Sequence, residues 1–212
     1  MDNLPLMSKF LPQHPTLSDQ SRAALSQATA ANEEGTEVQR VIAGERALTI
    51  YVDKQEIVTL MTLGNAPERL VLGYLRNQRF FETLSEIVSV QVDWEVEAAV
   101  VTTQGKNSAW KEKLARRTIT SGCGQGTQFD DQLAHISNTK IEAPVIRRST
   151  IYAALHAVSQ QNEIYRQAGG VHGCALIVND SVHRFEEDVG RHNAVDAIAG
   201  ALWLEPIDTR DA

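Results

Sequence analysis

The sequence predicts a mixed α/β fold in which a β-rich N-terminal part precedes a part that mixes helices and strands. Between Glu37 and Leu60, short apolar runs alternate with turns, as in consecutive strands of a sheet. From Ser149 onward, a helical pattern is followed by a hairpin pattern and then by a second helical pattern. We therefore expect a flexible leader over residues 1–35, a β-rich subdomain over 36–118 and an α/β subdomain over 119–212.

The leader is rich in Ser, Thr, Gln, Asn and Glu, and its hydrophobic periodicity is weak. Such a composition is typical of a loosely ordered segment. Ser18 is nevertheless a candidate N-cap for a short helix that reaches Ala31.

The β-rich subdomain contains the clearest strand pattern of the chain. Leu48, Ile50 and Val52 alternate with polar residues, as in a half-buried strand, and Asp53-Lys54 follows as a turn. A helix is expected after Asn65, with that residue near the N-cap and Pro67 in the first turn. Further strands are expected at four apolar runs: Val38–Ile42, Ile57–Leu60, Ile87–Val92 and Val96–Thr103.

In the α/β subdomain, Ser149 is the candidate cap of a helix that runs past Tyr165 and ends at Gly169. The next two apolar runs, His172–Asn179 and Val182–Glu186, predict a hairpin that turns at Asn179-Asp180. A last helix is predicted by the apolar positions Ala194, Val195, Ile198, Ala201 and Leu202.

Composition excludes several classes of protein. A chain of 212 residues with a net charge of −7 lacks the basic field that broad nucleic-acid binding needs. No segment is long and apolar enough to span a bilayer, and the proline-broken N-terminus resembles neither a signal peptide nor a membrane anchor. Two cysteines cannot form a disulfide framework, so we expect a reducing compartment, the cytoplasm.

Cys123 is the candidate nucleophile, within the segment SGCGQG. A thiol reacts as its thiolate, and neighbouring glycines leave the sulfur uncrowded. Arg116 and Arg117 are close enough in sequence to stabilise the anion. The alternative, a cysteine that merely occupies a glycine-rich loop, has equal weight on the sequence alone. Likewise, the basic stretch 104–118 is either a rim beside the thiol or a solvated loop and helix.

Cys174 lies in an apolar run, where a free cysteine behaves as a small hydrophobic residue. His172 alternates with it along the predicted strand, so both side chains point to one face. The sequence contains no CxxC or HxxxH pair, and we read His172 as a residue at the end of a strand near an active centre rather than a zinc ligand.

The segment 188–193 forms a second constellation at the start of the last helix. A helix N-terminus offers free N–H groups and a partial positive charge, and Arg191 adds a donor fork suited to phosphate. Gly190 permits close approach to the backbone, whereas Asp188 either caps the helix or holds Arg191. The alternative is a capped helix with an internal Asp188–Arg191 pair, and the two readings are equally weighted.

The motifs SGCGQG, GGVHGCAL and EDVGRHNAVDAI occur in this order and resemble those of the FdhD/NarQ family of formate dehydrogenase accessory sulfurtransferases. The front half agrees, because RALTIYVDKQEIVTLMTLGNAPERLVLGYL is similar to the opening strands and first helix of that family. The resemblance extends from about Glu37 to about Leu204.

This resemblance implies a β-rich part joined to a cytidine-deaminase-like α/β part without zinc. It also implies a function in which a cysteine desulfurase loads sulfur onto Cys123 as a persulfide. The sulfur then passes to the molybdenum (or tungsten) bis-guanine dinucleotide cofactor of formate dehydrogenase. The implied partners are the desulfurase, formate dehydrogenase and a second copy of the chain, with no nucleic acid and no membrane. The residues expected to bind the cofactor are His172, Asp188, Gly190, Arg191, His192 and Asn193.

Two departures from the family pattern qualify these expectations. Gly126 stands where many members carry a second cysteine, so Cys123 alone would carry the persulfide. The chain also stops soon after the last predicted helix, whereas family members continue, so we expect a C-terminally shortened α/β part with an uncovered apolar face. A binding protein that moves no sulfur and an inactive shortened copy are the alternative interpretations.

Overall fold

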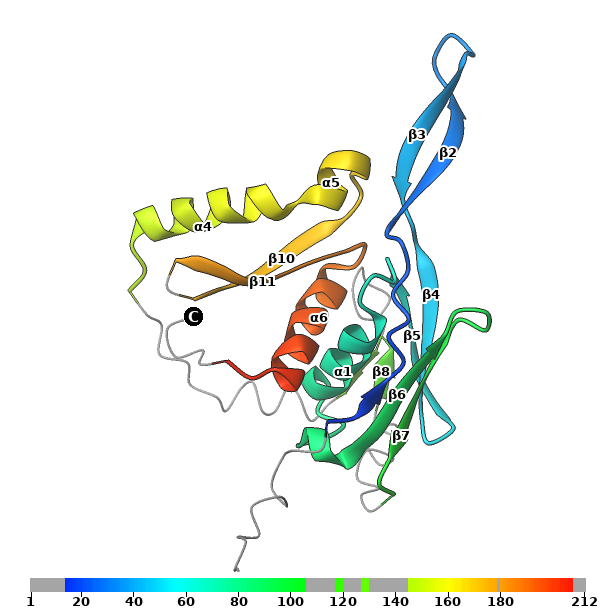
Figure 1. The fold of residues 1–212 in the computed structure, drawn as a ribbon, viewed down its shortest axis with the longest axis vertical. Coiled ribbons are helices and arrows are strands. Elements are labelled where there is room, and N and C mark those ends of the chain that lie inside the picture. The colour runs from blue at the N-terminus through cyan, green and yellow to red at the C-terminus, as the bar shows by residue number, and fades with distance from the viewer. Residues whose placement is uncertain (1–13, 106–116, 120–126, 130–144, 179, 208–212) are drawn as a thin grey trace, which may run out of the picture.

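A computed structural model of the chain describes residues 14–105, 117–119, 127–129, 145–178 and 180–207. Its elements form successive layers (Figure 1). A five-stranded sheet packs against helix α1, α1 packs against α6, and α6 packs against the hairpin β10–β11, whose other face carries α4. Helices and strands are mixed in this arrangement, and the predicted α/β class is confirmed.

The main sheet has the strand order β1-β6-β7-β4-β5. The pairs β6–β7 and β4–β5 are antiparallel, whereas β1–β6 and β4–β7 are parallel. The bounds of its strands are β1 Thr16–Leu17, β4 Arg46–Val52, β5 Gln55–Thr62, β6 Ile87–Asp93 and β7 Ala98–Thr103.

The strand pattern read from the sequence is confirmed in β4 to β7. Leu48, Ile50 and Val52 are fully buried on one face of β4, and their neighbours are half-buried. Asp53 and Lys54 both have positive φ, at 45° and 72°, which suits the two-residue turn that joins β4 to β5.

Helix α1 (Pro67–Asn77) covers this sheet. Pro67 begins the helix as predicted, and Asn65 lies near the N-cap, directly before the N-cap residue Ala66. A short 3-10 helix, η1 (Leu84–Glu86), leads into β6. Trp203 and Leu204 from the far end of the chain pack against the core that lies between α1 and the sheet.

Helix α6 (Arg191–Leu204) lies alongside α1 (Figure 1). Two glycines allow the close contact: a Cβ added at Gly73 would overlap the carbonyl oxygen of Asp196, and one added at Gly200 would overlap that of Arg69. The predicted apolar face of α6 is therefore only partly correct. Val195 is 49% exposed, whereas Asn193 and Asp196 are buried, because α6 is enclosed by α1 and by the hairpin.

The hairpin consists of β10 (His172–Val178) and β11 (Ser181–Asp188), close to its predicted bounds. The single helix predicted before it is instead two, α4 (Arg148–Gln161) and α5 (Glu163–Ala168). The physical reason is the buried carboxylate of Glu187, which accepts the backbone N–H groups of Ile164 at 3.0 Å and Tyr165 at 2.9 Å. Because these two backbone N–H groups donate to the carboxylate, a new helix, α5, begins at this point and α4 does not continue.

The expected leader contains regular structure from Thr16 onward, and the short helix predicted up to Ala31 is wrong. β2 (Leu25–Ala31) pairs antiparallel with β3 (Glu37–Ala43) in a separate two-stranded sheet that projects from the body (Figure 1). The approach to β2 is tied to the main sheet, because Arg46 donates to the carbonyls of Leu63 at 2.6 Å and Ala23 at 3.1 Å. The strand predicted at Val38–Ile42 is confirmed as β3. β2 is not predicted by the hydrophobic periodicity of the sequence, because most of its residues are exposed.

Another two-stranded sheet pairs β8 (Arg117–Ile119) with β9 (Thr127–Phe129) in antiparallel fashion. Within the described ranges, no helix combines the length and the apolar character needed to cross a membrane.

Candidate functional site

The start of α6 is the candidate site, and it is built where β11 ends. The last residue of β11 is Asp188. The chain then passes through Val189 and Gly190, and α6 begins at Arg191. Asp188 therefore belongs to a strand rather than to the helix cap. The polar residues from Asp188 to Asn193 divide into two sets, one buried inside the protein and one exposed.

Asp188 is the centre of the buried set. Its Oδ2 atom accepts hydrogen bonds from the Thr62 hydroxyl at 2.6 Å and the Leu63 backbone N–H at 3.2 Å. Its Oδ1 atom accepts from the Gly190 backbone N–H and from Asn193 Nδ2, both at 2.9 Å. The carboxylate is only 4% exposed, and these four donors replace the water that burial removes. None of the described hydrogen bonds or ion pairs joins it to Arg191, so the internal Asp188–Arg191 pair is absent from this part of the chain.

Asn193 completes the buried set. Its Nδ2 atom donates to the Met61 carbonyl at 2.7 Å as well as to Asp188. A Cβ at Gly190 would lie 2.9 Å from the same nitrogen, so the glycine makes room for this amide. The close approach of a ligand at Gly190 stays a prediction, and in this structure the space beside Gly190 is occupied by the Asn193 amide. Asp188 and Asn193 are engaged internally, and a direct ligand contact by either residue stays a prediction.

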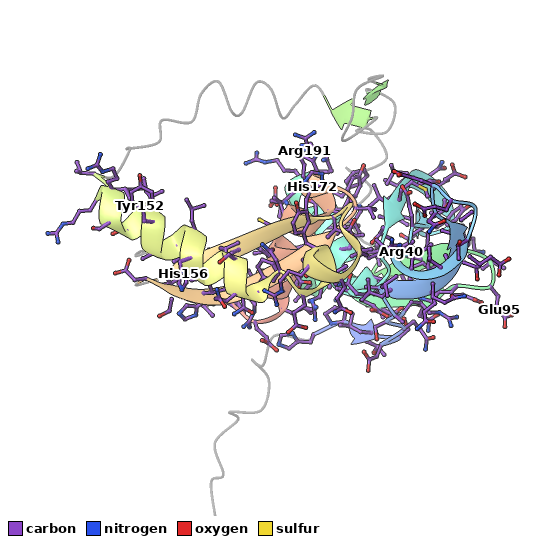
Figure 2. All side chains as sticks on the ribbon, turned by 90° about the horizontal axis from the view of Figure 1, so that it is seen from above. Arg40, Glu95, Tyr152, His156, His172 and Arg191 are labelled. Carbon is purple, nitrogen blue, oxygen red and sulfur yellow. The ribbon has the colours of Figure 1, made fainter. Side chains whose placement is uncertain are left out.

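The exposed set contains Arg191, His192 and His172. Arg191 and His192 are the first two residues of α6, and His172 is paired in register with Asp188 across the hairpin. In Figure 2, His172 and Arg191 project from the same side of the molecule. The guanidinium of Arg191 and the imidazole of His192 thus belong to the first turn of α6, and His172 lies on the strand beside Asp188. The N–H groups of this helix N-terminus carry partial positive charge. This surface is suited to an anion.

Two glycines in the left-handed region lead the chain to His172. Gly169 and Gly170 have φ values of 65° and 69°, a conformation that side-chain-bearing residues rarely adopt. The predicted helix end at Gly169 is confirmed. Val171 is then buried, and His172 emerges as the first exposed residue of β10.

Of the two cysteines, Cys174 lies within the described residues and Cys123 does not. Cys123 lies outside the described residues, in the segment of chain that connects β8 to β9, and so do Arg116 and most of the basic stretch. Cys174 is a half-buried free thiol on β10. Burial raises the pKa of the Cys174 thiol, against a smaller lowering by a hydrogen bond from the backbone at Ala175, so little reactive thiolate forms there.

The residues that sequence reasoning missed come from the N-terminal sheet. Thr62 is 1% exposed at the end of β5, and Met61 and Leu63 contribute backbone groups to the same cluster. A faint signal existed, because Thr62 is a polar residue at an inward position of an apolar strand. Nothing in the sequence, however, connects it to a carboxylate 126 positions further along the chain.

Other sites are less suited to the predicted chemistry. A cavity of about 460 Å³ lies at the opposite end of α6 and includes Leu204 and Glu205 in its lining. Its charged groups are largely paired with one another, for example Arg69 with Glu186 at 2.9 Å and Arg184 with Glu205 at 2.6 Å. Across the described ranges, no three His, Cys, Asp or Glu side chains gather in a way that could hold a metal ion.

Comparison with known proteins gives one consistent result. The model of the FdhD/NarQ family matches residues 43–212. A sulfur carrier protein FdhD from Bacillus licheniformis is 28% identical over 171 residues, covering 80% of this chain and 65% of its own length. The sulfur carrier protein FdhD of Listeria innocua is 31% identical over 181 residues, covering 82% of this chain and 68% of its own. The chain thus spans about two thirds of the length of these curated relatives.

A solved structure agrees on the fold. The crystal structure of a protein assigned as a formate dehydrogenase accessory protein from Desulfotalea psychrophila superposes with a TM-score of 0.59 at 22% sequence identity. The likeness covers 85% of this chain and 68% of that one. At this identity the comparison concerns the fold, whereas the family match covers most of the chain, including the motifs at residues 121–126, 169–176 and 187–198. The chain belongs to the FdhD/NarQ family.

Proposed function

We propose that this protein is a sulfur carrier that accepts persulfide sulfur on Cys123 and delivers it to a guanine dinucleotide cofactor of molybdenum or tungsten, for use by formate dehydrogenase. The observation that carries the proposal is the family match over residues 43–212, which includes Cys123 and the start of α6. Relatives that bear the name sulfur carrier protein support the chemistry.

Sulfur loading requires one thiol and a persulfide donor. The thiolate of Cys123 would attack the outer sulfur of a persulfide on a cysteine desulfurase. A new S–S bond forms on Cys123, the donor S–S bond breaks, and the desulfurase cysteine leaves as a thiolate. No net oxidant is needed, because the sulfur that moves is already at the persulfide level. Gly126, in place of a second cysteine, is compatible with this one-thiol step.

The exposed groups at the start of α6 suit the nucleotide part of such a ligand. Its pyrophosphates are anions, and Arg191 with the first N–H groups of α6 supplies donors of the right charge. No side chain caps this helix at Gly190. His172 and His192 would line the same surface, whereas Asp188, Gly190 and Asn193 would hold its shape.

The partners follow from the same proposal. A cysteine desulfurase supplies the sulfur and formate dehydrogenase receives the finished cofactor. A homodimer, expected from the family resemblance, is part of the proposal and is checked by light scattering of the purified protein. The cytoplasm is the proposed location, because free thiols stay reduced there.

Mass spectrometry of the protein after incubation with a cysteine desulfurase and cysteine tests the sulfur step. We expect a gain of one sulfur atom on Cys123, no gain in Cys123→Ser, and near wild-type loading in the matched control Cys174→Ser, whose thiol is half-buried. A Cys123→Ser protein that still accepts sulfur contradicts the proposal. Wild-type protein that binds nucleotide but accepts no sulfur would indicate a cofactor-binding protein instead.

Calorimetric titration with GDP tests the ligand site. Removing one charge-assisted contact in Arg191→Ala should weaken binding by about 1.5–3 kcal/mol while leaving the protein folded. His183→Ala is the control, because His183 is exposed on β11 and lies outside the start of α6, so this variant should bind GDP as the wild type does. Equal affinity in the wild type and Arg191→Ala would assign Arg191 to another role.

A further inference from the structure

The α6 start is held in place by the N-terminal sheet. Thr62, Asp188 and Asn193 are all buried, at 1%, 4% and 8% exposure, and they form one continuous hydrogen-bonded cluster. The cluster joins the end of β5 to the end of β11 and to the first turn of α6.

The cluster fixes the backbone on both sides of Arg191. On the N-terminal side, the Gly190 N–H donates to Asp188 Oδ1 at 2.9 Å. On the C-terminal side, the Asn193 amide spans from Asp188 to the Met61 carbonyl, 2.7 Å away. Arg191 and His192 lie between these two anchors and are exposed.

Thr62 is the residue of the sheet whose side chain takes part in this cluster. Its hydroxyl donates to Asp188 at 2.6 Å and accepts the Gly64 N–H at 3.2 Å. The Leu63 N–H, which also binds Asp188, follows directly in the chain. The orientation of the carboxylate, and through it the position of the α6 start, therefore depends on where β5 ends.

We propose that Thr62 is a positioning residue of the candidate ligand site: through Asp188 and Asn193, it holds the first turn of α6 so that Arg191 meets an anionic group. This inference rests on the proposed function, because it assigns the surface around Arg191 to ligand binding. Thr62 itself is buried, so its proposed role is to position Arg191 and not to contact the ligand. The N-terminal sheet thereby becomes part of a site whose exposed groups all come from the C-terminal part.

The substitution Thr62→Val keeps the shape of the side chain and removes the hydroxyl. We expect GDP to bind about five- to tenfold more weakly, since losing one hydrogen bond to a buried carboxylate frees the first turn to shift. Thr62→Ser retains the hydroxyl and should restore near wild-type affinity. Thr59→Val is the matched control, because Thr59 is exposed on the same strand and its hydroxyl hydrogen-bonds with its pair partner Thr49, at 2.9 Å, rather than with the buried cluster.

A double-mutant cycle separates positioning from stability. If Thr62 acts through Arg191, the variant that combines Thr62→Val with Arg191→Ala should bind GDP no more weakly than Arg191→Ala alone. A purely structural role would lower the unfolding midpoint of Thr62→Val but leave its dissociation constant unchanged at a temperature where all variants are folded. Additive losses of affinity would likewise overturn the positioning role.

The possible failures can be told apart. A wild-type protein that does not bind GDP refutes the proposed ligand site, and the role of Thr62 falls with it. A wild-type protein that binds GDP in an Arg191-dependent way, together with an unaffected Thr62→Val variant, refutes only the positioning role. Weaker binding in Thr59→Val as in Thr62→Val would also refute it, because the effect would then not be specific to the buried hydroxyl.

Discussion

Helices α1 and α4 are similar in length but differ completely in burial. α1 has 11 residues, eight of which are buried, whereas none of the 14 residues of α4 is buried. The reason lies in the layers around them. α1 is enclosed by the five-stranded sheet on one side and α6 on the other, whereas the main packing partner of α4 within the described residues is the two-stranded hairpin (Figure 1).

This difference in burial indicates that α1 contributes much more to the stability of the fold than α4 does. A two-stranded hairpin is marginal alone in water, and here its faces are covered by α6 and α4. α4 nevertheless leaves large apolar side chains exposed, among them Ile151, Tyr152 and Leu155. We therefore expect the free energy of unfolding to depend strongly on α1 and α6 and weakly on the outward residues of α4.

The matched pair Leu75→Ala and Leu155→Ala tests the comparison most directly. Leu75 in α1 is fully buried and Leu155 in α4 is 61% exposed, so the same chemical change leaves a cavity only in α1. We expect a loss of about 3 kcal/mol for Leu75→Ala and less than about 0.5 kcal/mol for Leu155→Ala. Urea unfolding followed by circular dichroism measures both. Similar losses would show that α4 is as firmly packed as α1.

Gly73→Ala tests whether the contact between α1 and α6 requires a missing side chain. The added Cβ overlaps the Asp196 carbonyl, so the helices must separate, and we expect a loss of about 2 kcal/mol. Intrinsic helix propensity alone would predict a gain of about 1 kcal/mol, so the sign of the change decides between the two effects. Ala153→Gly on the exposed face of α4 is the reciprocal control and should show only the propensity cost. A stabilised Gly73→Ala protein would mean that the two helices are less tightly packed.

Asp196 should make the same interface sensitive to pH. Burial raises its pKa from 3.8 to about 6, opposed by a hydrogen bond from Asn77 Nδ2 at 2.6 Å. The folded state then binds the proton more tightly than the unfolded state. The stability due to this group is therefore full below the unfolded pKa and falls as the pH rises from about 4 to about 6.

The substitution Asp196→Asn removes this dependence. Relative to the wild type, the variant should gain about 2 kcal/mol of stability between pH 4 and pH 7. Thermal unfolding at a series of pH values measures the difference. Glu186, whose pKa is also raised by burial, remains in both proteins and cancels in the comparison. A difference that does not change with pH would show that Asp196 is already ionised throughout this range.

Several elements could be predicted because their information is local. The alternation in β4, the proline at the start of α1 and the glycines before β10 each act within a few residues. The candidate site was predicted in the same way, as a run of polar residues at a helix start. β1 and β2 were missed because most of their side chains are exposed, and so have no apolar period to read.

The sequence by itself determined that Arg191 and His192 begin a helix and that His172 begins a strand, since caps, turns and periodicity depend on near neighbours. It could not decide which of the polar residues around them would face solvent. That division depends on Thr62, Leu63 and Met61, which reach Asp188 and Asn193 across more than 120 positions of the chain. Only the tertiary structure brings these groups together, because the hydrogen-bond donors of the buried Asp188 carboxylate are those that the packing of β5 and α6 places beside it.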